Sequence, residues 1–254
     1  MHGPLNHAKS AACSFRHTAC APQIHGMLSP AELEALLLSL RISAVAVLCA
    51  LPIAIALAAL LAHRRFPGKA IIDGALHLPM VLPPVVVGYL LLMILGTRAP
   101  VGAWLLQHLG IRFAFSWTGA ALASGIITFP FQFRAIRLSI EAIDSGVGDA
   151  AKTLGAGAFD RFVNLTLPLA LPGIVAGAIT AFAACLGEFG AIITFVSNIP
   201  GETRTLPLAI YSALQSPGGE AEAARLSLLS IGLALIGVTL AEFADRRVRV
   251  FAGR

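Results

Sequence analysis

Long apolar stretches recur along this chain, and they constrain its fold more than any other feature. They cover residues 36–62, 74–96, 117–133, 167–196 and 226–243. A helix needs about 20 such residues to cross roughly 30 Å of hydrocarbon, and each stretch reaches or approaches that length. The mean hydropathy of +0.83 is more than a soluble core could bury. The sequence therefore predicts an all-α integral membrane protein with about five, or at most six, transmembrane helices.

The basic residues lie mainly between these stretches, which favours a membrane surface as their partner. The net charge of +5 would also suit nucleic acid, but the Lys and Arg residues form no patch interleaved with aromatic residues. With five spans, the connection after the first span, residues 134–166 and the C-terminal tail share one side and hold most of the Lys and Arg. The positive-inside rule then predicts an N-terminus outside the cell and a cytoplasmic C-terminus.

The first 26 residues differ in composition from the rest of the chain. They hold four of the seven histidines together with Cys13 and Cys20, but their spacing fits no zinc pattern, so we predict no metal site. They also lack the apolar core of a secretory signal. We expect residues 1–26 to be a disordered extension, or sequence upstream of a true start at Met27, and residues 27–254 to form a single transmembrane domain.

Prolines interrupt the second apolar stretch at positions 79, 83 and 84. A proline at membrane depth frees backbone carbonyl groups, which only protein or a water-filled cavity can satisfy. This segment is therefore predicted to face protein or an aqueous path instead of lipid.

Residues 134–166 form the longest polar segment after residue 26, and a short motif within it is suited to bind another protein. An acid near the start of a helix suits the helix dipole, two alanines leave a low surface on which another protein can sit, and a glycine ends the helix. An ordinary helical connection between two spans explains the same pattern. The motif consists of Asp149, Ala150, Ala151, Lys152, Thr153, Leu154 and Gly155.

This motif, followed by Leu165-Thr166-Leu167-Pro168, resembles the EAA loop of permease subunits of bacterial ABC importers. In that superfamily the loop forms a coupling helix that docks into a cleft of the ATPase subunit. Two positions depart from the usual pattern, because Asp149 stands where Glu is common and Leu165 where Ile is common. The shorter Asp149 side chain would require a closer approach in any ion pair with the ATPase.

From about residue 27 onward the chain resembles the molybdate transport permeases, with sulfate and thiosulfate permeases as the nearest alternative. The resemblance is carried by residues 66–70, 77–89, 153–157, 187–191 and 196–207. It implies an ABC importer permease fold in the bacterial inner membrane. The implied partners are a second copy of the chain, two cytoplasmic ABC ATPase subunits that hold ATP and Mg, and a periplasmic molybdate-binding protein. The chain itself is then expected to bind no cofactor, and its cargo to be molybdate or tungstate.

Glu188 lies deep in the fourth apolar stretch, where an ionisable group is a functional candidate by default. Two interpretations stay open: a group on the transport path, or a structural acid satisfied by helix N–H groups or by Arg204. A membrane enzyme using Glu188 and Asp149 as acid and base is a weaker hypothesis, because the proposed topology puts them on opposite sides of the bilayer.

The residues around Glu188 are further candidates for the transport path. The small Gly187 and Gly190 allow close backbone approach, either at a dimer axis or at a helix contact elsewhere. Hydrogen-bonding side chains near the outer mouth are suited to touch an oxyanion; they are Thr194, Ser197 and Asn198.

Overall fold

The computed structural model describes residues 29–63 and 67–251. The predictions for residues 1–26, including a start at Met27, lie outside the described residues. Every regular element in the described part of the chain is helical, in agreement with the predicted class. In chain order the elements are α1 (Pro30–His63), α2 (Lys69–Val81), α3 (Pro84–Leu95), α4 (Pro100–Leu109), α5 (Trp117–Glu141), α6 (Ser145–Thr153), α7 (Ala158–Arg161), the π-helical turn η1 (Phe162–Thr166), α8 (Leu167–Leu186), α9 (Gly190–Val196), α10 (Leu206–Leu214) and α11 (Glu220–Phe251).

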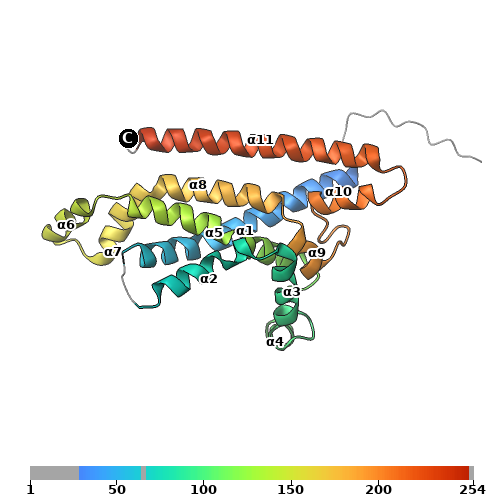
Figure 1. Ribbon diagram of the computed structural model, residues 1–254, viewed down its shortest axis with the longest axis horizontal. Helices are drawn as coiled ribbons and strands as arrows, with labels where there is room; N and C mark the ends of the chain where they lie inside the picture. The colour runs from blue at the N-terminus through green and yellow to red at the C-terminus, as the bar shows by residue number, and fades with distance from the viewer. Residues whose placement is uncertain (1–28, 64–66, 252–254) are drawn as a thin grey trace, which may run out of the picture.

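Helices α1, α5 and α8 pack side by side and form the centre of the bundle (Figure 1). Small residues allow this close approach. A Cβ atom added at Gly173 of α8 would overlap Ser139 of α5, and one at Gly177 would lie 3.1 Å from the Cβ of Ala135. The three helices are therefore in near backbone contact, which fixes their relative positions.

Three polar residues of α5 lie on one buried face of the helix. Ser124, Thr128 and Gln132 are four residues apart and at most 1% exposed, so they face neighbouring helices instead of lipid. The Thr128 hydroxyl lies 3.2 Å from the Cys185 thiol of α8. This burial explains how the central helix can be less apolar than its neighbours.

Three helical segments are long and apolar enough to cross a membrane by length and composition: Pro30–Ala62, Ala158–Leu186 and Glu220–Leu240. A bent pair, α2 with α3, passes the same test as one broken span, and α5 does not pass it. The predicted first, fourth and fifth spans thus overlap helices of sufficient length. The third, residues 117–133, coincides with α5, which continues to Glu141 because Arg137 finds acidic partners there.

The second predicted span, residues 74–96, corresponds to a broken span instead of one straight helix. The chain bends by 109° between α2 and α3, and Pro83 and Pro84 occupy the N-cap and first position of α3. Proline lacks the N–H group that would continue α2 but fits the first turn of a new helix. The prolines therefore produce an elbow, which we define as residues 81–84.

The fourth predicted span, residues 167–196, is also divided. Helix α8 ends at Leu186 and the short α9 begins at Gly190. Two segments predicted as polar connections contain helices as well, because α4 lies within residues 97–116 and α10 within residues 197–225.

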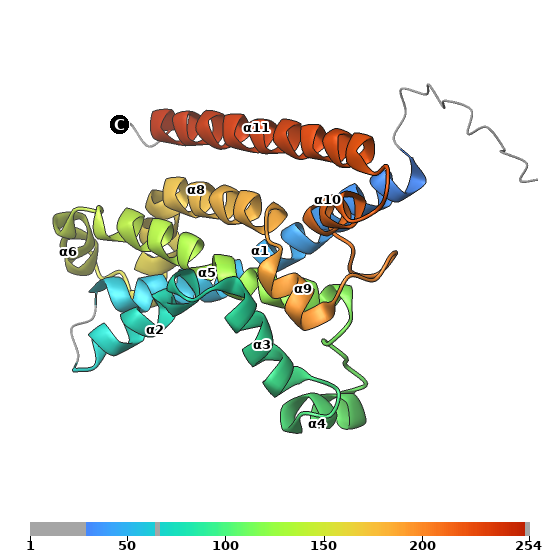
Figure 2. The same cartoon turned by 45° about the vertical axis from the view of Figure 1, so that its right-hand side comes forward.

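The two ends of the bundle carry different elements. The start of α1, α10 and the start of α11 lie together at one end, whereas α6 and the end of α11 lie at the other (Figures 1 and 2). We call these the α10 end and the α6 end.

Candidate coupling segment and transport path

Helix α6 is a short helix with a defined start and stop. The Asp144 carboxylate accepts a hydrogen bond of 2.8 Å from the Gly146 N–H and so caps the first turn. At the other end Gly155 adopts a φ of 86°, and the N–H of Ala156 bonds to Ala151 O over 3.0 Å. The glycine stop was predicted correctly. Asp149 was misplaced, because it lies mid-helix and Asp144 is the acid at the N-terminus.

The two faces of α6 differ in chemistry. Val147 is 42% exposed and Leu154 is 87% exposed, and Ala150 between them is exposed too. Beyond the helix, Phe159 is 79% exposed. Large apolar side chains at this level of exposure, gathered beside a short helix, are typical of a surface that another protein covers. We call residues 144–161 the coupling segment, and Val147, Ala150, Leu154 and Phe159 its apolar face.

The opposite face of α6 is polar and borders a cavity of about 590 Å³. The cavity lies among the ends of α1 and α5, helix α6 and the α7–η1 turn. Its charged lining residues are Glu141, Asp144, Asp149, Lys152 and Arg161. The Nη1 atom of Arg161 is buried there and has no hydrogen-bond partner within the described chain.

Asp149 and Lys152 form an ion pair of 2.6 Å on α6. The Lys152 ammonium, by its hydrogen bond and its charge, holds the pKa of the Asp149 carboxyl below its usual value. Their side chains are 67% and 59% exposed, so water and salt screen the pair and it adds little to stability. Asp149 is therefore a negative charge at the surface, accessible to a partner.

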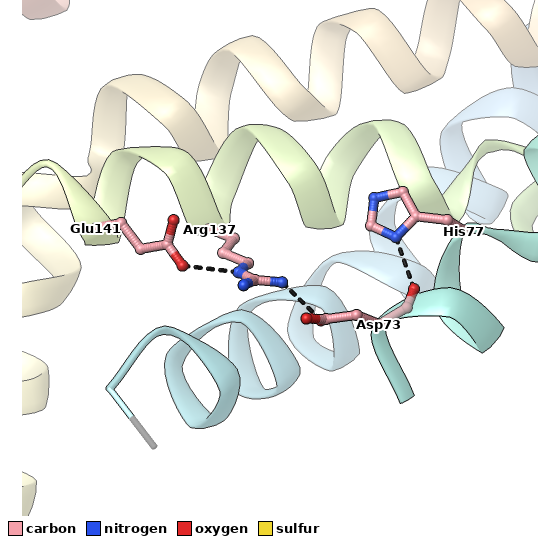
Figure 3. Close-up of polar contacts among 4 residues, drawn as sticks. All are labelled: Asp73, His77, Arg137 and Glu141. Carbon is pink, nitrogen blue, oxygen red and sulfur yellow. Dashed lines mark hydrogen bonds and ion pairs between the residues drawn. The ribbon is translucent and has the colours of Figure 1, made fainter. Parts of the chain in front are cut away.

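An ion bridge joins α5 to α2 close to the α6 end, and the sequence analysis missed it. Arg137 donates from Nη1 to the Asp73 carboxylate over 2.6 Å and from Nε to the Glu141 carboxylate over 2.8 Å (Figure 3). His77 Nδ1 lies 2.7 Å from the Asp73 carbonyl oxygen. The spacing of Arg137 and Glu141 was a usable signal for a helical pair. Asp73 is distant in sequence and offered none.

Glu188 serves as a cap for a helix. Glu188 is only 8% exposed, and its Oε1 accepts a hydrogen bond of 2.9 Å from the Ala191 N–H at the start of α9. Arg204 is occupied elsewhere, because its Nε donates to Asn198 Oδ1 over 3.1 Å. This geometry corresponds to the structural acid satisfied by helix N–H groups.

The polar side chains between α9 and α10 bond to their own loop and to α10. Thr203 is fully buried, donates to Ser197 O and accepts from the Ile199 N–H, both over 2.9 Å. Asn198 donates to Ser212 Oγ of α10 over 2.6 Å. Ser197 has a φ of 65° and a ψ of −171°, a conformation that non-glycine residues rarely adopt. We call residues 197–205 the outer loop.

The remaining candidates lie where α9 meets the elbow. A Cβ atom at Gly190 would lie 2.9 Å from the Pro84 Cβ, and one at Gly88 of α3 would lie 2.9 Å from the Thr194 Cβ. The Thr194 hydroxyl donates to Gly190 O over 2.7 Å. The close approach that Gly190 permits is thus between α9 and the elbow of the same chain, whereas Gly187 is exposed.

The structure brings the candidates into two groups. Asp149 to Gly155 lie on α6 or directly after it, at one end of the bundle, whereas α9, which holds Gly190 and Thr194 and is capped by Glu188, lies beside α3 toward the α10 end (Figure 2). Among the described residues, no three His, Cys, Asp or Glu side chains converge in a way that could hold a metal ion.

Comparisons with known proteins give this architecture a family. The chain is 55% identical over 228 residues to the molybdenum transport system permease protein ModB of Escherichia coli strain K12, which covers 90% of this chain and 100% of that protein. It is 51% identical over 223 residues to ModB of Haemophilus influenzae strain Rd, covering 88% of this chain and 97% of that protein.

A solved structure shares the fold. The bacterial alginate ABC transporter in complex with an alginate pentasaccharide-bound periplasmic protein matches with a TM-score of 0.70 at 20% identity, covering 87% of this chain and 80% of that chain. Residues 50–250 match the family model of the binding-protein-dependent transport system inner membrane component. The chain belongs to this family of transport-system inner membrane components.

Proposed function

We propose that this chain is the permease subunit of an ATP-driven importer that moves molybdate, or tungstate, from the periplasm to the cytoplasm by alternating access. The observation that carries the proposal is the 55% identity over the whole length of a protein named for molybdenum transport. The exposed apolar face beside α6 supports it, since a permease needs a surface that an ATPase can grip. In this proposal the chain hydrolyses nothing, and ATP and Mg belong to the ATPase.

The proposed topology has five crossings in the inner membrane: α1, the broken α2–α3 pair, α5, α8 and α11. The start of α1 and the end of α11 lie at opposite ends of the bundle (Figure 1), which an odd number of crossings requires. The α10 end is periplasmic and the α6 end cytoplasmic in this proposal, in keeping with the charge bias of the connections.

A second copy of the chain is proposed to cover the elbow and α3. Val81 is 80% exposed, Val85 53% and Tyr89 55% in the single chain, yet a bent backbone at membrane depth is not tolerated against lipid. A partner permease, with an aqueous path between the two copies, would satisfy it. Residues of α9 that pack on the elbow, including Thr194 and Gly190, would then lie near that path.

Two cytoplasmic ATPase subunits are proposed to bind the two copies of the apolar face. Val147, Ala150 and Leu154 would enter the ATPase cleft, and Asp149 would supply a negative charge at its rim. At the periplasmic side, a molybdate-binding protein would dock on the α10 end and deliver the anion.

Sulfate or thiosulfate transport is the second candidate, because the chain is also 39% identical over 170 residues to the chloroplastic sulfate permease 2 of Chlamydomonas reinhardtii, covering 67% of this chain and 46% of that protein. Direct competition distinguishes the two. In proteoliposomes that hold the permease, its ATPase and its binding protein, ATP should drive molybdate uptake that excess tungstate inhibits and excess sulfate leaves unchanged. Inhibition by sulfate at equal concentration would favour the second candidate.

The coupling role is tested by filling the apolar face. Ala150→Trp should abolish ATPase co-purification and molybdate uptake while leaving the amount of permease in the membrane unchanged, and Gly155→Asp should act in the same direction. Ala221→Trp, at an exposed alanine of the opposite end, is the matched control for ATPase co-purification and for the amount of permease in the membrane. Normal co-purification of the ATPase with Ala150→Trp would contradict the assignment.

A further inference from the structure

We propose that Arg137 is a positioning residue of the transporter: it ties α2, the inner half of the broken span, to the helix that leads into the coupling segment. The inference rests on the proposed function, since it concerns how motion of α6 reaches the transport path. The structure carries it by an ion bridge that holds together two elements far apart in sequence.

The bridge has the geometry of a fixed connection. One guanidinium group serves two carboxylates at once, Asp73 on α2 over 2.6 Å and Glu141 on its own helix over 2.8 Å (Figure 3). The planar guanidinium holds its donors in a rigid fork, so both bonds constrain its direction. The side chains of Arg137 and Asp73 are only 20% and 24% exposed, so the bond between them is less screened than a surface pair.

Aromatic contacts add to the constraint. The Arg137 guanidinium carbon lies 5.9 Å from the centroid of the Phe133 ring, one turn earlier on α5. The His77 ring meets the same Phe133 edge-on, with centroids 5.8 Å apart, and Phe133 is fully buried. Two successive turns of α2 therefore contact two successive turns of α5, and neither helix can rotate alone.

The bridge stands directly between the coupling segment and the elbow. On one side, α5 ends at Glu141, and Asp144 caps α6 after a connection of two residues. On the other side, α2 runs to the elbow, where Pro84 contacts Gly190 of α9. Among the described residues, Arg137 and Asp73 form the one ion pair between α2 and α5, so loss of the bridge would weaken the link by which motion of α5 and α6 carries α2.

The bridge predicts a specific defect, which is uncoupling. In proteoliposomes with the ATPase and the binding protein, Arg137→Met should lower molybdate uptake about tenfold, a size typical of coupling between sites, while ATP hydrolysis stays within about twofold of wild type. The charge swap Asp73→Arg with Arg137→Asp should recover a large part of the uptake. Arg134→Met, which removes an exposed positive charge from the same helix α5 and leaves the bridge intact, is the matched control and should leave the ratio of ATP hydrolysed to molybdate imported unchanged.

A covalent replacement keeps the test decisive if Arg137→Met fails to reach the membrane. Asp73→Cys with Arg137→Cys, in a chain whose own four cysteines are replaced, lacks the bridge until a short thiol-reactive crosslinker joins the two positions. Crosslinking should raise uptake about fivefold in the same membranes. No gain, or a loss of uptake on crosslinking, would overturn the proposal. Normal uptake in Arg137→Met would also overturn the proposal. Absence of ATP-driven molybdate uptake in the wild type would instead contradict the proposed function.

Discussion

The outer loop and the coupling segment are both polar interruptions between helices, yet they use their side chains in opposite ways. In the outer loop, the side chains of Thr203 and Asn198 form hydrogen bonds to the loop itself and to α10. On α6 the ion pair of Asp149 with Lys152 is exposed, and Leu154 on the apolar face is 87% exposed. We call the outer loop a closed region, because its polar side chains bond within the protein, and α6 an open region, because its side chains are accessible to a partner.

This difference separates structural residues from functional ones better than residue type does. A polar side chain whose partners lie within its own loop stabilises that loop and has little left for a ligand. An exposed large apolar side chain costs solubility, so its presence indicates a surface that is covered in the assembly. By this criterion Asn198 and Thr203 shape the outer loop, whereas the exposure of Leu154 supports its proposed contact with the ATPase.

Removing a hydroxyl from each region should give the largest contrast in stability. Thr203→Val leaves the part-buried Ser197 carbonyl and Ile199 N–H without their side-chain partner, which should lower the free energy of unfolding by about 2 kcal/mol. Thr153→Val removes an exposed hydroxyl that donates to Ala150 O of α6 and should change it by less than about 0.5 kcal/mol. Thermal unfolding of the two variants in detergent measures the difference. Equal loss in both would break the distinction between a closed and an open region.

A charge on the apolar face should damage assembly and spare stability. Leu154→Asp should weaken ATPase binding by about 2 kcal/mol, or roughly 30-fold, as expected for a large apolar contact at an interface. Its thermal unfolding should match wild type, because the side chain is already in water. Leu154→Met, which keeps the apolar surface, should bind normally in the same co-purification assay. Unfolding of Leu154→Asp at a lower temperature would mean that the residue supports the fold.

Ser197, the strained residue of the outer loop, allows a test in which stability is expected to increase. Ser197→Gly should raise the free energy of unfolding by about 1 kcal/mol, because glycine adopts a φ of 65° with a ψ of −171° without strain. Ser197→Ala keeps the strain and removes the hydroxyl, so it should give no such gain. Molybdate uptake should be unchanged in both variants. A common loss of uptake would indicate that the hydroxyl touches the anion and would return Ser197 to the transport path.

The sequence predicted the helical class and most of the apolar spans because hydrophobic length is a local property. It also placed the proline interruption, although not the 109° bend that follows from it. Arg137 and Glu141 were assigned to a polar connection. The sequence shows the charge of Arg137 but not that Asp73 on another helix pairs with it. The position of Asp149 was wrong for a related reason, since the start of α6 depends on a hydrogen bond from Gly146 to Asp144 that no spacing rule singled out.

The smallest expected effect on stability concerns Asp149 and isolates the role of its charge. Because Lys152 lowers the pKa of Asp149, the ion pair stabilises the fold above the pKa of an unfolded aspartate, about 3.9, and its contribution is lost as the pH falls through the lower folded value. Both side chains are largely exposed, so Asp149→Asn should leave thermal unfolding at pH 7 unchanged within error, with any difference from wild type vanishing at high salt or in acid. ATPase co-purification should nevertheless decrease in Asp149→Asn at pH 7, because the charge is available to a partner and is hardly used by the fold. Unchanged ATPase binding would mean that the apolar residues of the coupling segment bind the ATPase without help from the Asp149 charge.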